Sequence, residues 1–208
     1  MRYILSQPSI FLMIVALLSI SAFQRNSIWM SEIDLWSDTC KKSKNKARPF
    51  DALGNAYEKN GTYDKAIKAY RRAMMCNPTY GRAYNNLGYL YFSMGINDRA
   101  KSQFLKALDL KPDYAKAHNN LGNVYLREGQ HELAVKHFQN AIRFKPEYAE
   151  AYLNLGNAYL GRKLYDEALV QYEKALSLKP DYKKAQLNIE AVDQIKRYGE
   201  RAQVELVY

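Results

Sequence analysis

AKAHNNLGNVYLREGQHELAVKHFQNAIRFKPEY, residues 115–148, is a unit that recurs without a gap on both sides of itself. Its copies span residues 47–80, 81–114 and 149–182, and every copy is 34 residues long. In this register seven columns stand out: one is leucine, one is glycine, two are aromatic, two are alanine and one is proline. Their members are Leu53, Leu87, Leu121, Leu155; Gly54, Gly88, Gly122, Gly156; Tyr57, Tyr91, Tyr125, Tyr159; Tyr70, Phe104, Phe138, Tyr172; Ala66, Ala100, Ala134, Ala168; Ala73, Ala107, Ala141, Ala175; and Pro78, Pro112, Pro146, Pro180. Such a period predicts an array of stacked units.

Each unit contains two apolar stripes at helical spacing, separated by a turn. The turn carries a glycine, at Gly61, Gly95 and Gly129, which can adopt the left-handed conformation that ends a helix. The fourth unit has Lys163 at that position, and we expect Gly161 to provide the turn instead or the unit to be slightly destabilised. One helical hairpin cannot bury both stripes, so stability is expected to come from stacking neighbours.

The period and the L-G…Y…A…F…A…P pattern resemble the tetratricopeptide repeat family. The resemblance implies an all-α, right-handed superhelix with four full repeats over residues 47–182. Residues 25–46 are expected to add a half-repeat, because Trp36 aligns with Tyr70 one period later. Residues 183–208 are expected to form a capping helix and a tail, since a polar face there would solubilise the open end of the stack.

The N-terminal segment Tyr3–Gln24 contains no charged residue. It is long enough to cross a hydrocarbon core of about 30 Å, which predicts a transmembrane anchor or signal-anchor within residues 1–24 that contacts the bilayer through residues 3–24. The shorter aliphatic run Ile10–Ile20 is also typical of a cleavable signal peptide, with cleavage after Ser21. A single-pass membrane protein with extracytoplasmic repeats, periplasmic in a bacterium, is the first expectation, and a soluble exported module is the alternative.

Residues 25–39 read R-N-x-x-W-x-x-E-x-x-L-W-x-D-T. This run resembles the joint between the last membrane helix and the repeats in polytopic membrane proteins related to O-mannosyltransferases. The resemblance implies that the repeats lie outside the cytoplasm and could serve as the substrate-recruiting arm of a membrane glycosyl-transfer system.

The formal charge of +10 lies within residues 1–148, while the fourth repeat is slightly acidic. The excess either keeps the surface soluble or attracts anionic lipid or an acidic partner. Nucleic acid is not an expected partner, because the basic residues are dispersed and no reading motif occurs. Cys40 and Cys76 differ by two positions in repeat register, which argues against a disulfide.

No catalytic motif is present, so we expect neither enzymatic activity nor a cofactor. His131 and His137 do not have the spacing of a zinc-protease helix and fall on different helix faces, so no metal site is predicted. His118 stands in a column that is otherwise aromatic and is expected to pack as a ring.

The predicted binding surface is the side of each first helix opposite its packing face. With Leu121 and Tyr125 facing the core, this stripe is rich in asparagine. The candidate peptide-binding residues are Asn55, Asn85, Asn86, Tyr89, Lys116, Asn119, Asn120, Asn123, Asn154 and Asn157. An amide side chain offers a donor and an acceptor, so it can pair with the backbone of an extended peptide. Asn86, Asn120 and Asn154 form one column, which resembles the asparagine ladder of O-linked N-acetylglucosamine transferases; hydrogen bonds between helices are an alternative role.

These observations predict a membrane-tethered scaffold or adaptor that assembles complexes by binding a protein or peptide in a concave, asparagine-lined groove. The alternatives are the glycosyl-transfer arm and the exported module.

Overall fold

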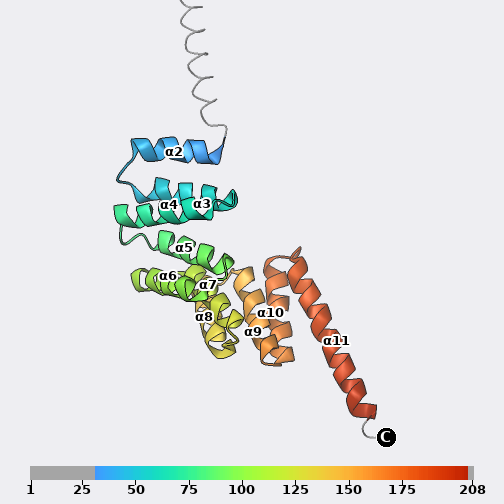
Figure 1. Ribbon diagram of the computed structural model, residues 1–208. Coiled ribbons are helices and arrows are strands. Elements are labelled where there is room, and N and C mark those ends of the chain that lie inside the picture. Colours follow the sequence, from blue (N-terminus) through green and yellow to red (C-terminus); the bar gives the residue numbers. More distant parts are fainter. Residues whose placement is uncertain (1–30, 206–208) are drawn as a thin grey trace, which may run out of the picture. The chain divides into compact units, whose positions relative to one another are not determined.

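The structure, a computed structural model, describes residues 31–205. All regular elements in this range are α-helices joined by short turns (Figure 1), which confirms the predicted all-α repeat fold. The chain divides into two compact units, Met1–Asn77 and Pro78–Tyr208. The predicted anchor, residues 3–24, lies outside the described range, and no described helix combines the length and apolar character that a membrane span requires.

The described part of the first unit contains α2 (Glu32–Lys42), α3 (Ala47–Lys59) and α4 (Tyr63–Cys76). Ser31 caps α2, because its hydroxyl accepts a hydrogen bond from the Asp34 backbone N–H at 3.2 Å and satisfies a donor that the first turn leaves open. Helices α3 and α4 form a hairpin, and α2 packs on α3. Helix α2 thus covers one side of the first full repeat.

Both cysteines belong to this unit and are free thiols. Cys40 is buried with Leu53 and Ala69, and Trp36 packs against the same cluster. Burial raises the pKa of Cys40 to about 11, and the nearby Cys76 adds to the rise. A thiol with a raised pKa is a weak nucleophile at neutral pH, so Cys40 has a packing role.

The second unit contains three helical hairpins and a terminal helix. The hairpins pair α5 with α6, α7 with α8 and α9 with α10, and each hairpin also packs on the next through α6 with α7, α8 with α9 and α10 with α11. The elements are α5 (Gly81–Ser93), α6 (Asn97–Leu110), α7 (Ala115–Arg127), α8 (His131–Phe144), α9 (Ala149–Gly161), α10 (Tyr165–Leu178) and α11 (Lys183–Glu205).

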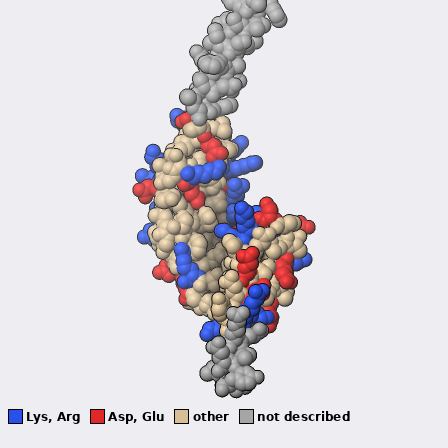
Figure 2. Space-filling model, turned by 90° about the vertical axis from the view of Figure 1, so that its right-hand side faces the viewer, with Lys and Arg blue, Asp and Glu red and all other residues tan. Residues whose placement is uncertain are grey.

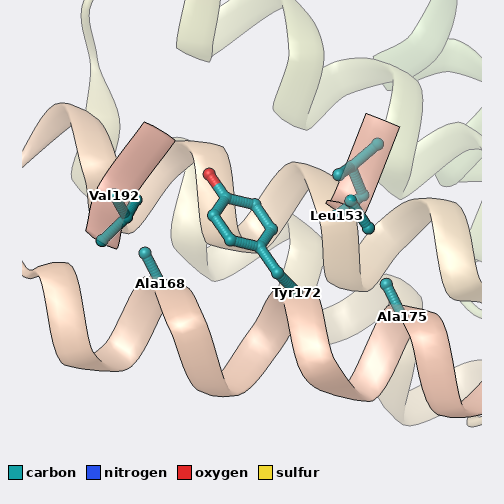
Figure 3. Packing of buried hydrophobic residues seen from close by; sticks show 6 residues of the cluster. Leu153, Ala168, Tyr172, Ala175 and Val192 are labelled. Carbon is teal, nitrogen blue, oxygen red and sulfur yellow. The ribbon is translucent and has the colours of Figure 1, made fainter. Parts of the chain in front are cut away.

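A glycine on the first helix and a ring on the second helix form the centre of each hairpin. In the third repeat, a Cβ atom at Gly122 would lie 2.6 Å from Cε1 of Phe138, closer than real Cβ contacts occur. Phe138 is fully buried. Figure 3 shows the equivalent ring of the fourth repeat, Tyr172, between Ala168 and Ala175 of α10. Glycine therefore allows the two helices to close around a rigid aromatic ring.

The turns between paired helices use the predicted glycines. Gly61, Gly95 and Gly129 have φ values of +71°, +77° and +72°. After α7, the N–H of Gly129 donates to the carbonyl of Leu126 at 3.0 Å, and the N–H of Gln130 donates to Tyr125 at 2.9 Å. These two bonds form a Schellman motif, which satisfies carbonyl groups at the end of the helix.

The fourth repeat forms the same turn with a different residue, so the prediction for Gly161 is wrong. Lys163 itself adopts the left-handed conformation, with φ +59°, and the neighbouring Leu164 N–H donates to Tyr159 at 3.0 Å. Gly161 is the last residue of α9 and has a packing role, because a Cβ atom there would overlap the imidazole of His131. Lys163 is the one described residue other than glycine with a positive φ.

The expected capping helix is α11, and it continues as far as Glu205, so most of residues 183–208 are helical. Ala185 and Val192 are fully buried against the fourth repeat, and the Lys196 ammonium lies 2.6 Å from a carboxylate oxygen of Asp166. The helix therefore covers the apolar end of the last hairpin.

Candidate functional site

The ten predicted binding residues lie on the first helices of the four repeats, α3, α5, α7 and α9. Asn55 belongs to the first unit, and the others belong to the second. In the second unit, first helices touch one another directly, α5 against α7, α7 against α9 and α9 against α11. These contacts decide which of the predicted side chains are accessible.

Five of the asparagines take part in hydrogen bonds on or between neighbouring first helices. Asn120 Nδ2 donates to Asn85 Oδ1 at 3.0 Å, and Asn154 Nδ2 donates to Asn119 Oδ1 at the same distance. Asn85 Nδ2 also donates to Asn86 Oδ1 at 3.3 Å. Asn85 and Asn119 are 0% exposed, so neither lines a surface. The prediction that these two side chains contact a ligand is therefore wrong. A buried amide requires such a partner, which explains why these positions are paired.

Two further asparagines hold a buried tyrosine. The hydroxyl of Tyr70 lies 2.8 Å from Asn55 Oδ1 and 2.6 Å from Glu58 Oε2, and the hydroxyl of Tyr172 donates to Asn157 Oδ1 at 2.9 Å. Asn157 also accepts a bond from Asn188 Nδ2 of α11 at 2.8 Å. A tyrosine at this buried position needs an acceptor for its hydroxyl, and the asparagine on the facing helix provides it.

Three predicted residues remain available for a ligand. Tyr89 is 49% exposed, Lys116 is exposed and Asn123 is half-buried. Asn123 occupies the position of Asn157, but its repeat has a phenylalanine, Phe138, in place of the tyrosine. Within residues 31–198 the Asn123 side chain therefore lacks the partner that its counterpart has, and no hydrogen bond to it is formed there.

Arg127 joins α7 to α5, the two helices that carry these residues. Its guanidinium stacks on the Phe92 ring at 3.5 Å and donates to the Phe92 carbonyl at 2.8 Å, so α7 and α5 are joined at this point. Asn123 lies one turn before Arg127 on α7, and Tyr89 lies one turn before Phe92 on α5. We call Tyr89, Lys116, Asn123 and Arg127 the α5–α7 surface.

The chemistry of this surface is that of a binding face. An aromatic ring, a free amide and two cations can contact an extended peptide through apolar, hydrogen-bonding and charged groups. On the face in Figure 2, basic and acidic side chains are interspersed with uncharged ones. Among the described residues, no group of three or more metal-ligating side chains lies close enough together to hold an ion.

The roles of Asn188 and of the Asn157–Tyr172 pair were missed by sequence reasoning. The sequence carried only a partial signal for the second, because asparagine follows leucine-glycine in both repeats whose aromatic column is tyrosine but also in the third repeat, which has Phe138. Asn188 was not predicted, because it lies in the tail, outside the four 34-residue units. It occupies the column of Asn120 and Asn154, one period further along.

Family comparisons agree with the hairpin geometry and the repeat period. Residues 54–95, 97–129 and 122–161 match a family described as TPR repeat, and residues 149–182 match one described as tetratricopeptide repeat. The chain belongs to the tetratricopeptide repeat (TPR) family. No curated protein matches this TPR chain. As a TPR protein, it has the architecture of a protein–protein interaction scaffold.

Several solved structures are similar to this TPR protein. The crystal structure of MamA protein has 30% sequence identity and a TM-score of 0.60, and the match covers 73% of this chain and 83% of MamA. YrrB, described as a TPR protein with an unusual peptide-binding site, has 23% identity and a TM-score of 0.62, with 78% and 84% covered. The first TPR of Spaghetti (RPAP3), bound to the HSP90 peptide SRMEEVD, has 24% identity and a TM-score of 0.55, with 56% and 93% covered. The last two similarities concern the fold alone.

Proposed function

We propose that this TPR protein is an adaptor that binds an extended segment of a partner protein on its α5–α7 surface. The proposal rests mainly on the Asn123 side chain, which has no hydrogen-bond partner among the described residues. The other seven predicted asparagines form hydrogen bonds with the chain's own side chains, whereas the Asn123 amide forms none among the described residues. Its donor and acceptor are available for a peptide group of the partner.

The neighbouring side chains suit the same ligand. Tyr89 presents a large, rigid ring, which provides contact area at a low entropic cost. Lys116 and Arg127 attract carboxylates, and the stacking of Arg127 on Phe92 holds its guanidinium in one place before a ligand arrives. YrrB and RPAP3 carry a peptide-binding site or a bound peptide in their structure descriptions, which supports a peptide as the ligand class.

A peptide-display selection tests the proposal. Peptides selected on the wild-type protein are expected to bind at least about tenfold more weakly to Tyr89→Ala and Asn123→Ala, since each change removes a central contact. The matched controls are Leu105→Ala, an exposed apolar residue on α6, and Asn140→Ala, a half-buried asparagine on α8. Equal binding by all four variants would place the site elsewhere and overturn the proposal.

Membrane tethering through residues 3–24 is the second part of the proposal. It rests on the uncharged stretch, which is long enough to cross a bilayer. The native protein is expected to resist carbonate extraction and to keep its first residues, with the repeats on the extracytoplasmic side. Recovery in the soluble fraction with an N-terminus near Ala22 would instead indicate the exported module. The comparisons give the O-mannosyltransferase resemblance no support, so a role in glycosyl transfer is not part of the proposal.

A further inference from the structure

The chain contains three histidines, and two of them meet inside the third repeat. His118 of α7 and His137 of α8 face each other with 3.0 Å between their Nδ1 atoms. The other repeats form the same hairpin without histidine. They carry Phe50, Tyr84 and Tyr152 at the first position, and Ala69, Gln103 and Gln171 at the second. The fold therefore does not require an imidazole at either place.

The hydrogen bonds determine where the protons lie. The Pro112 carbonyl oxygen is 3.0 Å from His118 Nε2, and because a carbonyl can only accept, this nitrogen carries a hydrogen. The neutral His118 ring then has a lone pair on Nδ1, so His137 must donate from its own Nδ1. One proton lies between the two rings. If both Nδ1 atoms are protonated, two N–H groups face each other and the contact is lost.

The surroundings do not compensate a positive charge on the pair. His118 is 8% exposed and stacks on Phe144 with 5.6 Å between ring centroids, and His137 stacks on Tyr125 at 5.3 Å. The charged groups of α8 that act on the pair, Arg143 and Lys136, are both cations.

From α6, the Lys101 ammonium lies 5.4 Å from the centroid of the Tyr125 ring, and it is paired with Glu128 of α7 at 2.8 Å. No carboxylate contacts either imidazole in the part of the chain that the structure describes. Among the described residues of α9, no charged group contributes to the pKa shift of either ring.

We infer that the His118–His137 contact acts as a latch between α7 and α8: it holds the helices together while one proton is shared and breaks when both Nδ1 atoms are protonated. The third repeat therefore loosens in mildly acidic solution before its neighbours do. The inference goes beyond the adaptor role and does not depend on it. Helix α7 also carries Lys116, Asn123 and Arg127, so opening of the latch would disturb the α5–α7 surface as well.

The direction of the pH effect follows from burial. Burial lowers the pKa of His137 to about 4, with the neighbouring His118 and Lys136 adding to the fall, and burial also lowers the pKa of His118. Both values lie below the ordinary value of 6.5, so the folded third repeat prefers the neutral rings. Its stability is fully present above pH 6.5 and is lost as the pH falls from there towards 4.

Hydrogen exchange of the full chain, followed by mass spectrometry, tests the latch. Exchange is compared between about pH 7 and about pH 5 after correction for the chemical exchange rate. Peptides from α7 and α8 are expected to open about twentyfold more often at the lower pH, as linkage predicts for the His137 shift alone. Peptides from α9 and α10, which contain no histidine, are expected to change less.

The matched variant replaces both rings with residues that the second repeat uses at the same positions, His118→Tyr with His137→Gln. The third repeat of this variant is expected to show the same protection from hydrogen exchange at both pH values. His131, which lies outside the pair, is unchanged in the variant. Unchanged protection of α7 and α8 in the wild type, or an equal loss in the double variant, would overturn the latch. Imidazole titration by NMR provides a second test that needs no variant, because two rings titrating near the ordinary value would also overturn it.

Discussion

Replacement of Gly122 by alanine is expected to destabilise the protein by about 2 kcal/mol, within the range for overpacking of a close-packed core. The new methyl group would meet Cε1, Cδ1 and Cζ of Phe138 at 2.6, 2.8 and 2.9 Å. The ring is fully buried and cannot move aside without displacing α7 or α8. Urea unfolding followed by circular dichroism measures the change as a lower midpoint with an unchanged slope.

Gly81 provides the matched control for this substitution. It is the first residue of α5, and a Cβ atom there would meet nothing closer than the Ala107 carbonyl oxygen at 3.5 Å. Gly81→Ala should therefore leave stability unchanged or raise it slightly, because alanine favours the helix over glycine by up to about 1 kcal/mol. The double variant Gly122→Ala with Phe138→Leu should lose less than the sum of the single changes. A neutral Gly122→Ala, or strict additivity, would contradict the steric explanation.

Replacement of Asn85 by leucine is expected to cost about 2 kcal/mol, because it leaves the buried amide of Asn120 without its acceptor. Asn120 is 6% exposed, so water cannot readily replace the lost partner. Leucine itself fits this column, since Leu153 occupies it in the fourth repeat and is 5% exposed. The loss should therefore come from the unpaired amide rather than from steric strain. Equilibrium unfolding in urea measures it.

Removal of both partners distinguishes the hydrogen bond from general packing. Asn85→Leu with Asn120→Leu should be less destabilising than the sum of the single changes, because no buried polar group is left unpaired. Asn123→Ala is the control on the same face of α7. It should change stability by less than about 0.5 kcal/mol, as expected for a side chain with no structural contact to lose. Equal losses for Asn85→Leu and Asn123→Ala would refute the division into structural and available asparagines.

The candidate site was only partly predictable, because one residue type serves three purposes. Asn85 and Asn123 have the same helical periodicity and lie on the same side of their helices, so no argument from one helix can separate them. The difference arises from the adjacent helix. Asn120 reaches Asn85, whereas no described side chain reaches Asn123. The pattern within one repeat does not show which asparagine gains a partner, since that depends on how the next repeat is placed against it.

The histidine pair shows the same limit. His118 was correctly predicted to pack as a ring, and it stacks on Phe144. Its contact with His137 was not predicted, because the two positions are 19 residues apart and lie on different helices. Hairpin closure brings them together, and burial then changes their protonation.

The sequence alone determined the elements that depend on local chemistry: the 34-residue period, the helix pairs, the turn glycines such as Gly129, and the glycine opposite each aromatic ring. These follow from backbone conformation and side-chain volume, which each repeat carries within itself. The tertiary structure decided the rest. It allowed Lys163 to adopt the turn conformation, buried Asn85 and Asn119, left Asn123 available and joined His118 to His137. Each of these outcomes depends on which groups a neighbouring helix brings within hydrogen-bonding or packing distance, and a pattern that repeats from unit to unit does not specify that.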